Sequence, residues 1–559
     1  MRKLSTTGIL FGTALFTLAL LSLSFRRSGN NDFEVAKNLD IFASIFRELN
    51  AYYVDDLKTE KLVQTGINAM LNSLDPYTTY IDEEEMDGYR LQTTGKYGGI
   101  GALIRTSGEK DERYVIIAEP YEDSPAQRSG LLAGDKIVSI EGKPMKNKNT
   151  DDVSKMLKGT PGTEVRITIE RPGETEPIEK TIRREEIKLK SVPYYGMLPD
   201  GKTGYIRFTN FTENCSQAVE AALIDLRDKQ KAKSIVLDLR DNPGGLLNEA
   251  VAVANIFVNQ GQEIVSTRGR ASDIESKSYK ANDTPTDLQI PLAVLVDNGS
   301  ASASEIVAGT IQDLDRGVVV GERSYGKGLV QTTKNIGFNS KLKITTAKYY
   351  LPSGRCIQAI DYANLKNDHK KLPDSLHTAF KTKGGRTVYD TGGIKPDSEV
   401  EKPYLGNITV ALATKNHLFD YATQYRIKHP TIPTPDKFEL TEADYADFLQ
   451  FLKGKNYDYT TESEALLKQL EENADKEQYA EALKTEIADL EAKMKSDKSN
   501  DLTKFKAEIK NMLEIEIVSR YYWQRGQIQE SIEGDPDVSK AVEILNQAAN
   551  YQNILNVKK

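Results

Sequence analysis

The sequence predicts an α/β protein in which a larger α/β core is joined to a smaller α+β module and to helical segments. Between residues 203 and 400, apolar runs such as "SIVLDLR" and "PLAVLV" alternate with amphipathic helical stretches. Runs that are apolar along their whole length indicate strands of a sheet whose two faces are both covered. With 559 residues, the chain is also long enough for about three or four domains of ordinary size.

Changes in composition divide the chain into regions. Residues 31–95 carry apolar side chains at helical spacing, and residues 96–187 combine a glycine-rich loop with alternating apolar runs. Beyond residue 405, a proline-rich stretch leads into helical sequence dense in Glu and Lys. We therefore expect a signal peptide or signal anchor at 1–30, an N-terminal helical region at 31–95, an α+β domain at 96–187, the α/β core at 188–404 and a C-terminal helical extension at 405–559.

The N-terminus has the layout of a secretory signal or a short signal anchor. Arg2 and Lys3 precede an apolar stretch at residues 9–25, and no A-x-A-like cleavage site follows it. Basic residues flank both sides of the stretch, so the charge rule does not choose between the two. We expect the rest of the chain to be extracytoplasmic, either tethered to the membrane or released.

The bulk composition excludes several kinds of partner. The net charge is -8, from 74 basic and 82 acidic residues, which gives no electrostatic footprint for nucleic acid. Cys215 and Cys356 lack the spacing of metal ligands, so they form either one disulfide or two buried thiols. We expect no metal and no cofactor.

A serine-rich turn is the first candidate for chemistry. The segment "DNGSASASEIVAGT", residues 297–310, follows the buried run "PLAVLV" where a strand gives way to a helix. A serine nucleophile needs a base within hydrogen-bond reach and preorganised donors for the oxyanion, and amides at a helix N-terminus supply such donors. By itself the serine cluster is more typical of a helix N-cap than of a nucleophile.

Lysine is the better candidate for the base. The four histidines, His369, His377, His417 and His429, lie in polar, proline-broken or helical-tail contexts. In "VVVGERSYGKGLVQ", by contrast, Lys327 sits between glycines just after a buried strand. Burial disfavours the charged amine, which makes a neutral lysine available as a base. At a further strand end, "LDLRDNPGGLL" offers the amides of Gly244 and Gly245 as oxyanion donors or, more simply, a proline-glycine turn.

Together these segments resemble the carboxy-terminal processing peptidases, the tail-specific Ser-Lys proteases. "DLRDNPGG", "SASASEIVAG" and "GERSYGKGLVQ" match the three signatures of that family in order, and the likeness extends over about residues 35–400, including "LNSLDPYTTYI". The resemblance implies a crotonase-like α/β peptidase core with an inserted PDZ domain. It also implies Ser302 as the nucleophile, Lys327 as the general base and Gln331 as the residue that orients the lysine.

The same resemblance assigns the remaining polar groups. The oxyanion donors would be the amide of Ala303 and that of Gly244 or Gly245. Ser300 and Ser304 would be helix caps, and we interpret Glu305 as a first-turn helix carboxylate rather than a catalytic acid. A bacterial periplasm or cell envelope is the expected location.

The α+β module at 96–187 is identified by the resemblance as the PDZ domain. Its loop "GGIG", the residues Gly98, Gly99, Ile100 and Gly101, offers consecutive amides for a C-terminal carboxylate, and the adjoining strand edge can accept a peptide. We therefore expect protein or peptide substrates with accessible C-termini as partners. The C-terminal helices, with the seam Leu483, Ile487, Leu490 and Met494, pack on their own chain in the interpretation that we favour; binding of an adaptor or a second copy stays open.

Other features of the sequence suggest two rival functions. A penicillin-binding or β-lactamase-like enzyme is suggested by "SYGK" and "KTG", but their order is reversed and no S-D-N occurs. The other rival is a PDZ adaptor whose peptidase core binds peptides without cleaving them. The presence of both Ser302 and Lys327 favours the protease.

Overall fold

The structure is a computed structural model that describes residues 29–108, 112–270, 276–362, 377–401 and 404–555. It divides into two compact units, Met1–Tyr80 and Ile81–Lys559. The apolar stretch 9–25 that predicts a signal or anchor lies outside the described residues. Within the described ranges, no helix combines the length and the hydropathy needed to cross a membrane.

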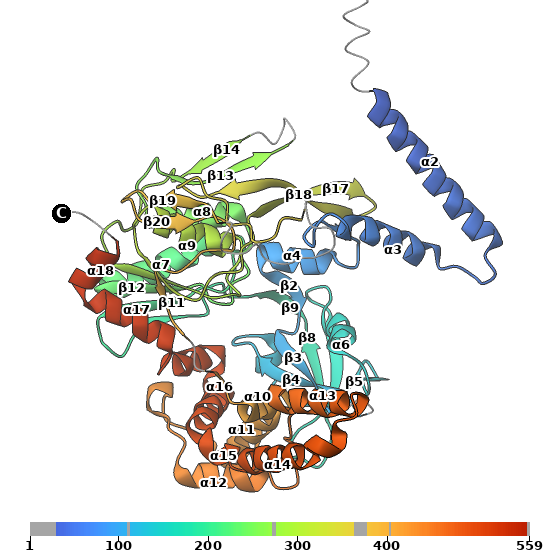
Figure 1. The fold of residues 1–559 in the computed structure, drawn as a ribbon, viewed down its shortest axis with the longest axis vertical. Helices are drawn as coiled ribbons and strands as arrows, with labels where there is room; N and C mark the ends of the chain where they lie inside the picture. Colours follow the sequence, from blue (N-terminus) through green and yellow to red (C-terminus); the bar gives the residue numbers. More distant parts are fainter. Residues whose placement is uncertain (1–28, 109–111, 271–275, 363–376, 402–403, 556–559) are drawn as a thin grey trace, which may run out of the picture. The chain divides into compact units, whose positions relative to one another are not determined.

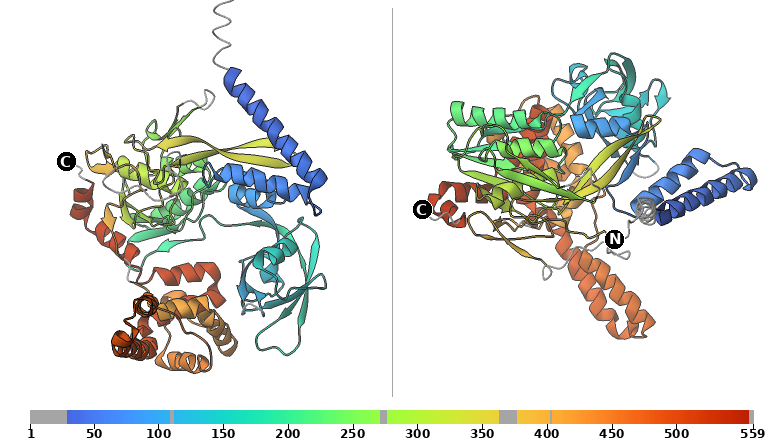
Figure 2. Two further views of the ribbon diagram at one scale, coloured as in Figure 1. Left: turned by 45° about the vertical axis from the view of Figure 1, so that its right-hand side comes forward. Right: turned by 90° about the horizontal axis from the view of Figure 1, so that it is seen from above.

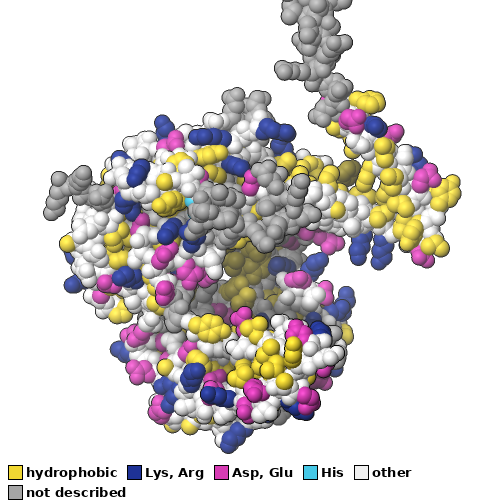
Figure 3. Space-filling view, in the orientation of Figure 1, with side chains coloured by type: hydrophobic (Ala, Val, Ile, Leu, Met, Phe, Trp, Pro, Cys, Tyr) yellow, Lys and Arg dark blue, Asp and Glu magenta, His cyan; other side chains and the backbone are white. Residues whose placement is uncertain are grey.

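The first unit is built from α2 (Gly29–Tyr52) and α3 (Thr59–Asn72), in the region where helical spacing predicts helices. The two helices meet where Gly66 faces the ring of Phe42. Much of their apolar surface is exposed, as the yellow side chains along α2 in Figure 3 show; Phe33, Leu39 and Met70 are all more than half exposed.

The second unit contains the α/β core, which is built around a main, mostly parallel sheet. Its strand order is β10 (Tyr194–Met197), β11 (Thr203–Arg207), β12 (Ser234–Asp238), β15 (Leu292–Val296), β16 (Val318–Gly321) and β21 (Ser398–Glu399). Strand β10 is antiparallel to β11, and the other neighbours are parallel. One face is covered by α7 (Cys215–Ile224), α8 (Leu247–Asn255) and α9 (Ala303–Asp313).

The other face of the main sheet is covered by the end of the C-terminal extension. Helices α17 (Pro536–Asn546) and α18 (Ala548–Ile554) lie beside β11 and β12 in Figure 1. Val236, Leu295 and Val320 of the sheet form one buried cluster with Ala541 and Ile544 of α17. Both faces of the sheet are therefore covered, as the apolar strands predict, but the second layer comes from a segment that the sequence indicated as a separate extension.

A buried charge cluster joins α17 to the end of β12. Arg240 donates to Asp238 at 2.7 Å, to Asp535 at 2.7 Å and to Asp537 at 2.9 Å. Burial alone would raise the pKa of Asp238, but Arg240 and Arg207 lower it to about 2. Asp238 is the last residue of β12, and Arg240 lies in the loop that carries Gly244, so the C-terminal helices are tied to that loop.

The α+β module has its own sheet, in the order β3 (Ala102–Ser107), β4 (Tyr114–Pro120), β5 (Lys136–Ile140), β7 (Glu164–Glu170) and β8 (Ile178–Arg183). Within the described residues β3 is an edge strand, and α6 (Thr150–Leu157) lies near it. Strands β2 (Lys96–Gly99) and β9 (Glu185–Lys188) pair at the two ends of the module. The module also contains α5 (Pro125–Arg128) and β6 (Lys143–Pro144).

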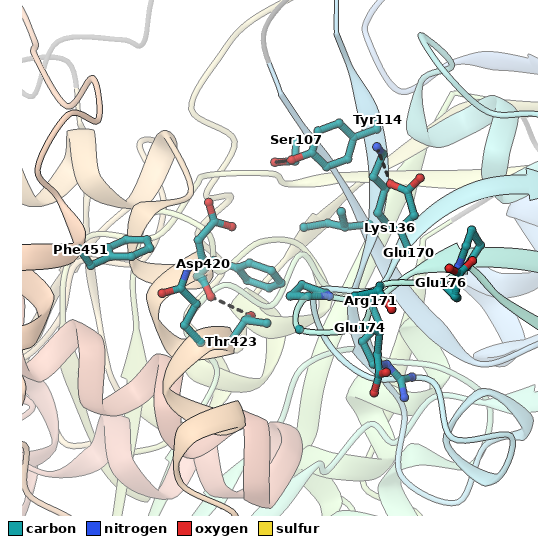
Figure 4. Close-up of a pocket in the computed structure, with 18 of the residues that line it drawn as sticks. Ser107, Tyr114, Lys136, Glu170, Arg171, Glu174, Glu176, Asp420, Thr423 and Phe451 are labelled. Carbon is teal, nitrogen blue, oxygen red and sulfur yellow. Dashed lines mark hydrogen bonds and ion pairs between the residues drawn. The ribbon is translucent and has the colours of Figure 1, made fainter.

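The helical part of the extension contacts this module. Arg105 of β3 lies over the ring of Phe419, with 4.8 Å between the guanidinium carbon and the ring centroid. The longest helix, α16 (Lys506–Ile532), is kinked at Trp523, and the next amide, that of Gln524, donates to Glu119 at 2.6 Å. A cavity of about 530 Å³ remains between the two parts, with Lys136 and Glu170 on one side and Asp420 and Phe451 on the other (Figure 4).

Other helices of the extension pack on their own chain. Helices α13 (Glu462–Lys476) and α14 (Ala480–Ser499) form a hairpin, drawn in orange in Figure 2, with Leu467, Ala474 and Ile487 buried. Leu490 of the predicted seam stays half exposed. The remaining helices here are α10 (Asn407–Thr414), α11 (His417–Lys428), the 3-10 helix η4 (Pro435–Lys437), α12 (Glu442–Phe451) and α15 (Asp501–Lys504).

A second, antiparallel sheet completes the α/β core. It pairs β17 (Leu329–Gly337) with β18 (Ser340–Tyr350), β18 with β13 (Glu263–Gly269) and β13 with β14 (Lys277–Lys280). The remaining elements are β1 (Thr79–Ile81), α4 (Met86–Thr94), the π-helix η1 (Asp225–Lys229), β19 (Ala379–Lys381) and β20 (Thr387–Tyr389). Cys215 and Cys356 are free thiols, which excludes the disulfide alternative.

We expect Ile544→Ala to destabilise the protein by about 2–5 kcal/mol, because it opens a cavity in the cluster beneath the main sheet. Lys540→Ala on the same helix removes only a partly exposed side chain and should change the free energy of unfolding by less than about 0.5 kcal/mol. Urea denaturation measures both. Equal effects of the two variants would show that α17 does not support the core.

Candidate active site

Ser302 stands where the main sheet passes into α9. It follows β15 and is the N-cap residue of α9, with φ 55° and ψ -109°, a backbone conformation that non-glycine residues rarely adopt. Its flanking serines are wholly buried, whereas Ser302 itself is half-buried. The turn therefore singles out the middle serine of the three.

The flanking serines do not act as the predicted helix caps. The Ser300 hydroxyl donates to the carbonyl of Leu239 at 2.8 Å, and the Ser304 hydroxyl donates to the carbonyl of Asn242 at 2.8 Å. Both acceptors belong to the loop after β12, so the two hydroxyls link one strand end to the next. The hydroxyls bond elsewhere because β12 and β15 are parallel neighbours that end side by side, and the loop after β12 therefore reaches both serines.

The carboxylate of Glu305 joins the serine turn to the lysine turn. It is completely buried. One oxygen accepts the amides of Ser302 at 2.8 Å and Lys327 at 2.9 Å. The other oxygen accepts the Ser324 hydroxyl at 2.5 Å and the Gly326 amide at 2.7 Å.

Four donors therefore converge on one buried carboxylate. Burial raises the pKa of Glu305 to about 7, although all four donors lower it. The ionised form fits the arrangement, because each oxygen then offers lone pairs to two donors. Glu305 is a first-turn helix carboxylate, as the sequence indicated, and it is also the link between the two turns.

Lys327 lies in the connection from β16 to β17 and is half-buried. Gly326 before it has φ 90°, and a Cβ there would come within 2.5 Å of the Ala359 Cβ, so only glycine fits. The Gly328 amide after it donates to Gln358 Oε1 at 2.7 Å. Because β15 and β16 are parallel neighbours, the turns that leave their carboxyl ends bring Ser302 and Lys327 to the same edge of the sheet.

The two glycines of "DNPGG" differ in their relation to Ser302. A Cβ on Gly244 would lie 3.0 Å from the Ser302 Cβ and 2.8 Å from the Ala303 nitrogen, so Gly244 faces the serine turn directly. Its amide donates to Asn242 Oδ1 at 2.9 Å. Gly245, in contrast, lies against the carbonyl of Phe211.

Gln331 lies on β17, four residues beyond Lys327. Its side-chain amide donates to Thr345 Oγ1 at 3.2 Å, across the β17–β18 pair. The structure thus places Gln331 on the strand that follows the lysine turn.

The predicted carboxylate loop of the α+β module is divided between two elements. Gly98 and Gly99 belong to β2 and pair with Glu186 and Glu185 of β9. Ile100 and Gly101 connect β2 to the edge strand β3. The second half of the loop, Ile100 and Gly101, is therefore the part that leads into the edge strand β3.

Sequence reasoning missed Asn242 and the linking role of Glu305. Ser302 and Glu305 have the spacing of a capping box, S-x-x-E, which could have indicated that the Glu305 carboxylate returns to the Ser302 amide. The Asn242 side chain accepts the nearby Gly244 amide and donates to the carbonyl of Phe208, 34 residues earlier, so local spacing alone does not identify its role.

Comparisons with known proteins identify the class of this fold and site. The sequence model of peptidase family S41 matches residues 202–368, and the model of the PDZ domain matches residues 116–171. A third, described as a probable PDZ-protease C-terminal helical domain, matches residues 408–545. The chain is therefore a serine-type peptidase with a PDZ domain and a C-terminal helical domain.

Similar proteins narrow the class to a family. The chain is 40% identical over 357 residues to a carboxy-terminal-processing protease of Bartonella bacilliformis, covering 63% of this chain and 80% of that protein. It is 35% identical over 356 residues to a probable CtpA-like serine protease of Staphylococcus aureus, covering 62% and 69%. The chain belongs to the family of carboxy-terminal-processing proteases, as the sequence motifs predict.

Among solved structures, the chain is similar to a photosystem II D1 C-terminal processing protease. The two are 27% identical, with a TM-score of 0.33, and the match covers 65% of this chain and 93% of the other. The PDZ domain of a carboxy-terminal protease from Vibrio cholerae, solved in complex with a peptide, is 29% identical, with a TM-score of 0.15, and the match covers 17% of this chain and 99% of that domain.

We expect Glu305→Gln to lower kcat for peptide cleavage by at least about tenfold, because its amide nitrogen cannot accept the donors that converge there. Burial raises the pKa of Glu305 to about 7 in the folded state, so folding favours the protonated form of this carboxyl group. The stability of wild type relative to Glu305→Gln should therefore fall as the pH rises from about 4.5 to about 7.

Denaturation at several pH values, together with steady-state kinetics, tests this prediction. Glu249→Gln is the matched control, because Glu249 also accepts main-chain amides, those of Asn214 and Ser216, at the start of α7. Unchanged kcat and a pH-independent stability difference for Glu305→Gln would contradict the linking role.

Proposed function

We propose that the protein is an endopeptidase that recognises the C-terminal tails of extracytoplasmic proteins through its PDZ domain and cleaves them near their C-termini with a Ser302–Lys327 dyad. The observation that carries the proposal is the shared carboxylate of Glu305, which holds the amides of both residues. Two turns with no common role would not need a buried acidic group between them, because such a group is costly unless its hydrogen bonds are satisfied.

In the proposed reaction, Lys327 accepts the hydroxyl proton of Ser302 while Ser302 Oγ attacks the scissile carbonyl carbon. The tetrahedral intermediate collapses as the C–N bond breaks, and the leaving amine takes the proton from Lys327. Water then attacks the acyl carbon of the ester while Lys327 accepts a proton from the water. The ester bond to Ser302 Oγ breaks, Lys327 returns the proton to that oxygen, and the carboxyl product leaves.

The oxyanion in this reaction needs amide donors beside Ser302. We assign one donor to Ala303 at the start of α9, where the helix dipole favours negative charge. The other comes from Gly244 or Gly245. Gly244 is the nearer to Ser302, but its amide donates to Asn242, so using it requires that bond to be released or shared. Gln331, at the root of the β17–β18 hairpin, is assigned to orient Lys327.

Two of the histidines have hydrogen-bond partners away from the serine turn. His417 bonds the carbonyl of Asn456, and His429 that of Tyr425, both within the helical domain. The main-chain amide of Lys327, in contrast, is held beside the serine turn by the Glu305 carboxylate.

The PDZ domain is assigned to capture the substrate tail. The edge strand β3 can accept the tail as an added strand, and the turn at Ile100 and Gly101 lies where the tail carboxylate would end. An extracytoplasmic location is supported by the signal-like residues 1–30 and by the family.

The alternative is a PDZ adaptor with an inactive core. It predicts tail binding without cleavage, so the following experiment separates the two functions.

Ser302→Ala and Lys327→Ala should each abolish cleavage of an unfolded substrate, because one loses the nucleophile and the other the base. Both should bind a C-terminal peptide as wild type does, measured by fluorescence anisotropy. Lys334→Ala, on the exposed part of β17, is the matched control and should cleave normally. Wild type that binds the peptide and never shortens the substrate would favour the adaptor.

Gly101→Ala should weaken binding of a tail peptide by about tenfold or more. Gly101 has φ 76°, and an added Cβ would lie 2.5 Å from the Ser124 Cβ, which displaces the turn before β3. Gly142→Ala is the control, since Gly142 has φ 73° and open space around its Cβ. If both variants bind like wild type, the carboxylate does not bind at this turn.

A further inference from the structure

Tyr349 places its hydroxyl between the serine turn and the lysine turn. It lies on β18 and is 1% exposed. The hydroxyl donates to the carbonyl of Lys327 at 2.7 Å and lies 3.3 Å from the carbonyl of Ser302. Its main-chain amide also donates to the carbonyl of Gly328 at 3.0 Å.

This hydroxyl complements the carboxylate of Glu305. Glu305 accepts the amides of Ser302 and Lys327, and Tyr349 meets the carbonyls of the same two residues. The main-chain polar groups of both residues are thus held by two buried side chains. The Ser302 carbonyl also accepts the Ile306 amide at 2.9 Å, and its second lone pair faces the Tyr349 hydroxyl, whose single proton is directed mainly to the nearer carbonyl of Lys327.

The position of the hydroxyl is fixed by the strand that carries it. Strand β18 is paired on one side with β17 and on the other with β13, where Tyr349 is opposite Thr267. The ring belongs to the main hydrophobic cluster of the core. A phenylalanine would fill that cluster equally well, whereas a buried hydroxyl is costly unless it is hydrogen-bonded. The hydroxyl therefore serves the two carbonyls rather than the packing.

We propose that Tyr349 is a positioning residue that fixes the Lys327 turn relative to Ser302. The proposal rests on the proposed function of the Ser302–Lys327 pair. Small displacements between a nucleophile and its base reduce the rate of the chemical step strongly, while substrate binding depends on other surfaces. Loss of the hydroxyl should therefore lower kcat and leave KM and tail binding nearly unchanged.

Tyr349→Phe tests the proposal because it removes one oxygen and keeps the ring. The matched control is Tyr350→Phe, the next residue on the strand, whose ring lies under the guanidinium of Arg268. The concentration of active sites is titrated with a serine-reactive fluorophosphonate, and kcat and KM for a tail-bearing peptide are measured per titrated site. We expect kcat about tenfold or more lower for Tyr349→Phe and KM within about twofold of wild type, with Tyr350→Phe like wild type.

Other outcomes overturn the proposal. If Tyr349→Phe reduces the titratable fraction or the Tm while kcat per titrated site stays at the wild-type value, the hydroxyl is only structural. If Tyr349→Phe cleaves like the control Tyr350→Phe, Tyr349 has no positioning role. The proposed dyad is still supported in that case if Ser302→Ala and Lys327→Ala are inactive. If Ser302→Ala and Lys327→Ala cleave like wild type, the proposed dyad and the positioning role fall together.

Discussion

Two turns that leave neighbouring parallel strands meet on one buried carboxylate, that of Glu305. A charged group at this depth is tolerated because four donors surround it, and the donors belong to both turns. If either turn is displaced, the carboxylate keeps its burial and loses part of its hydrogen bonding. The two turns are thus energetically coupled, and neither reaches its final conformation without the other.

The same coupling explains how the strained backbone of Ser302 persists. A non-glycine residue with φ 55° and ψ -109° needs surroundings that determine its conformation from several sides. Glu305 holds the Ser302 amide, and the buried hydroxyls of Ser300 and Ser304 tie the flanking residues to the loop after β12. The two serine hydroxyl contacts cross from the end of β15 to the loop after β12, so the strained serine is supported by the neighbouring strand end as well as by its own helix.

The sequence predicted those parts of the fold and site that have local patterns. The apolar runs at 234–238 and 292–296 are fully buried strands, and "SASASE" does mark the passage from strand to helix. The predicted role of Ser300 and Ser304 as helix caps was wrong. Local spacing suggests a cap, but the carbonyls that accept their hydroxyl groups lie about 60 residues earlier in the chain. The catalytic roles of Ser302, Lys327 and Gln331 stay predictions.

For a similar reason, local sequence patterns could not predict where α17 packs. Val538, Ala541 and Ile544 show that the helix has an apolar face, and nothing in that face says which surface it covers. The surface is decided by complementary partners, here the underside of the main sheet and the guanidinium of Arg240.

The bond between Arg240 and Asp535 spans 295 residues of sequence. During synthesis the strands of the main sheet emerge long before the helix that covers their second face. Until then, the apolar side of the sheet and the charges at the end of β12 lack their partners, and the loop that carries Gly244 lacks its anchor. The main sheet and the loop that carries Gly244 therefore reach their final packing only after the last helices of the chain have been made.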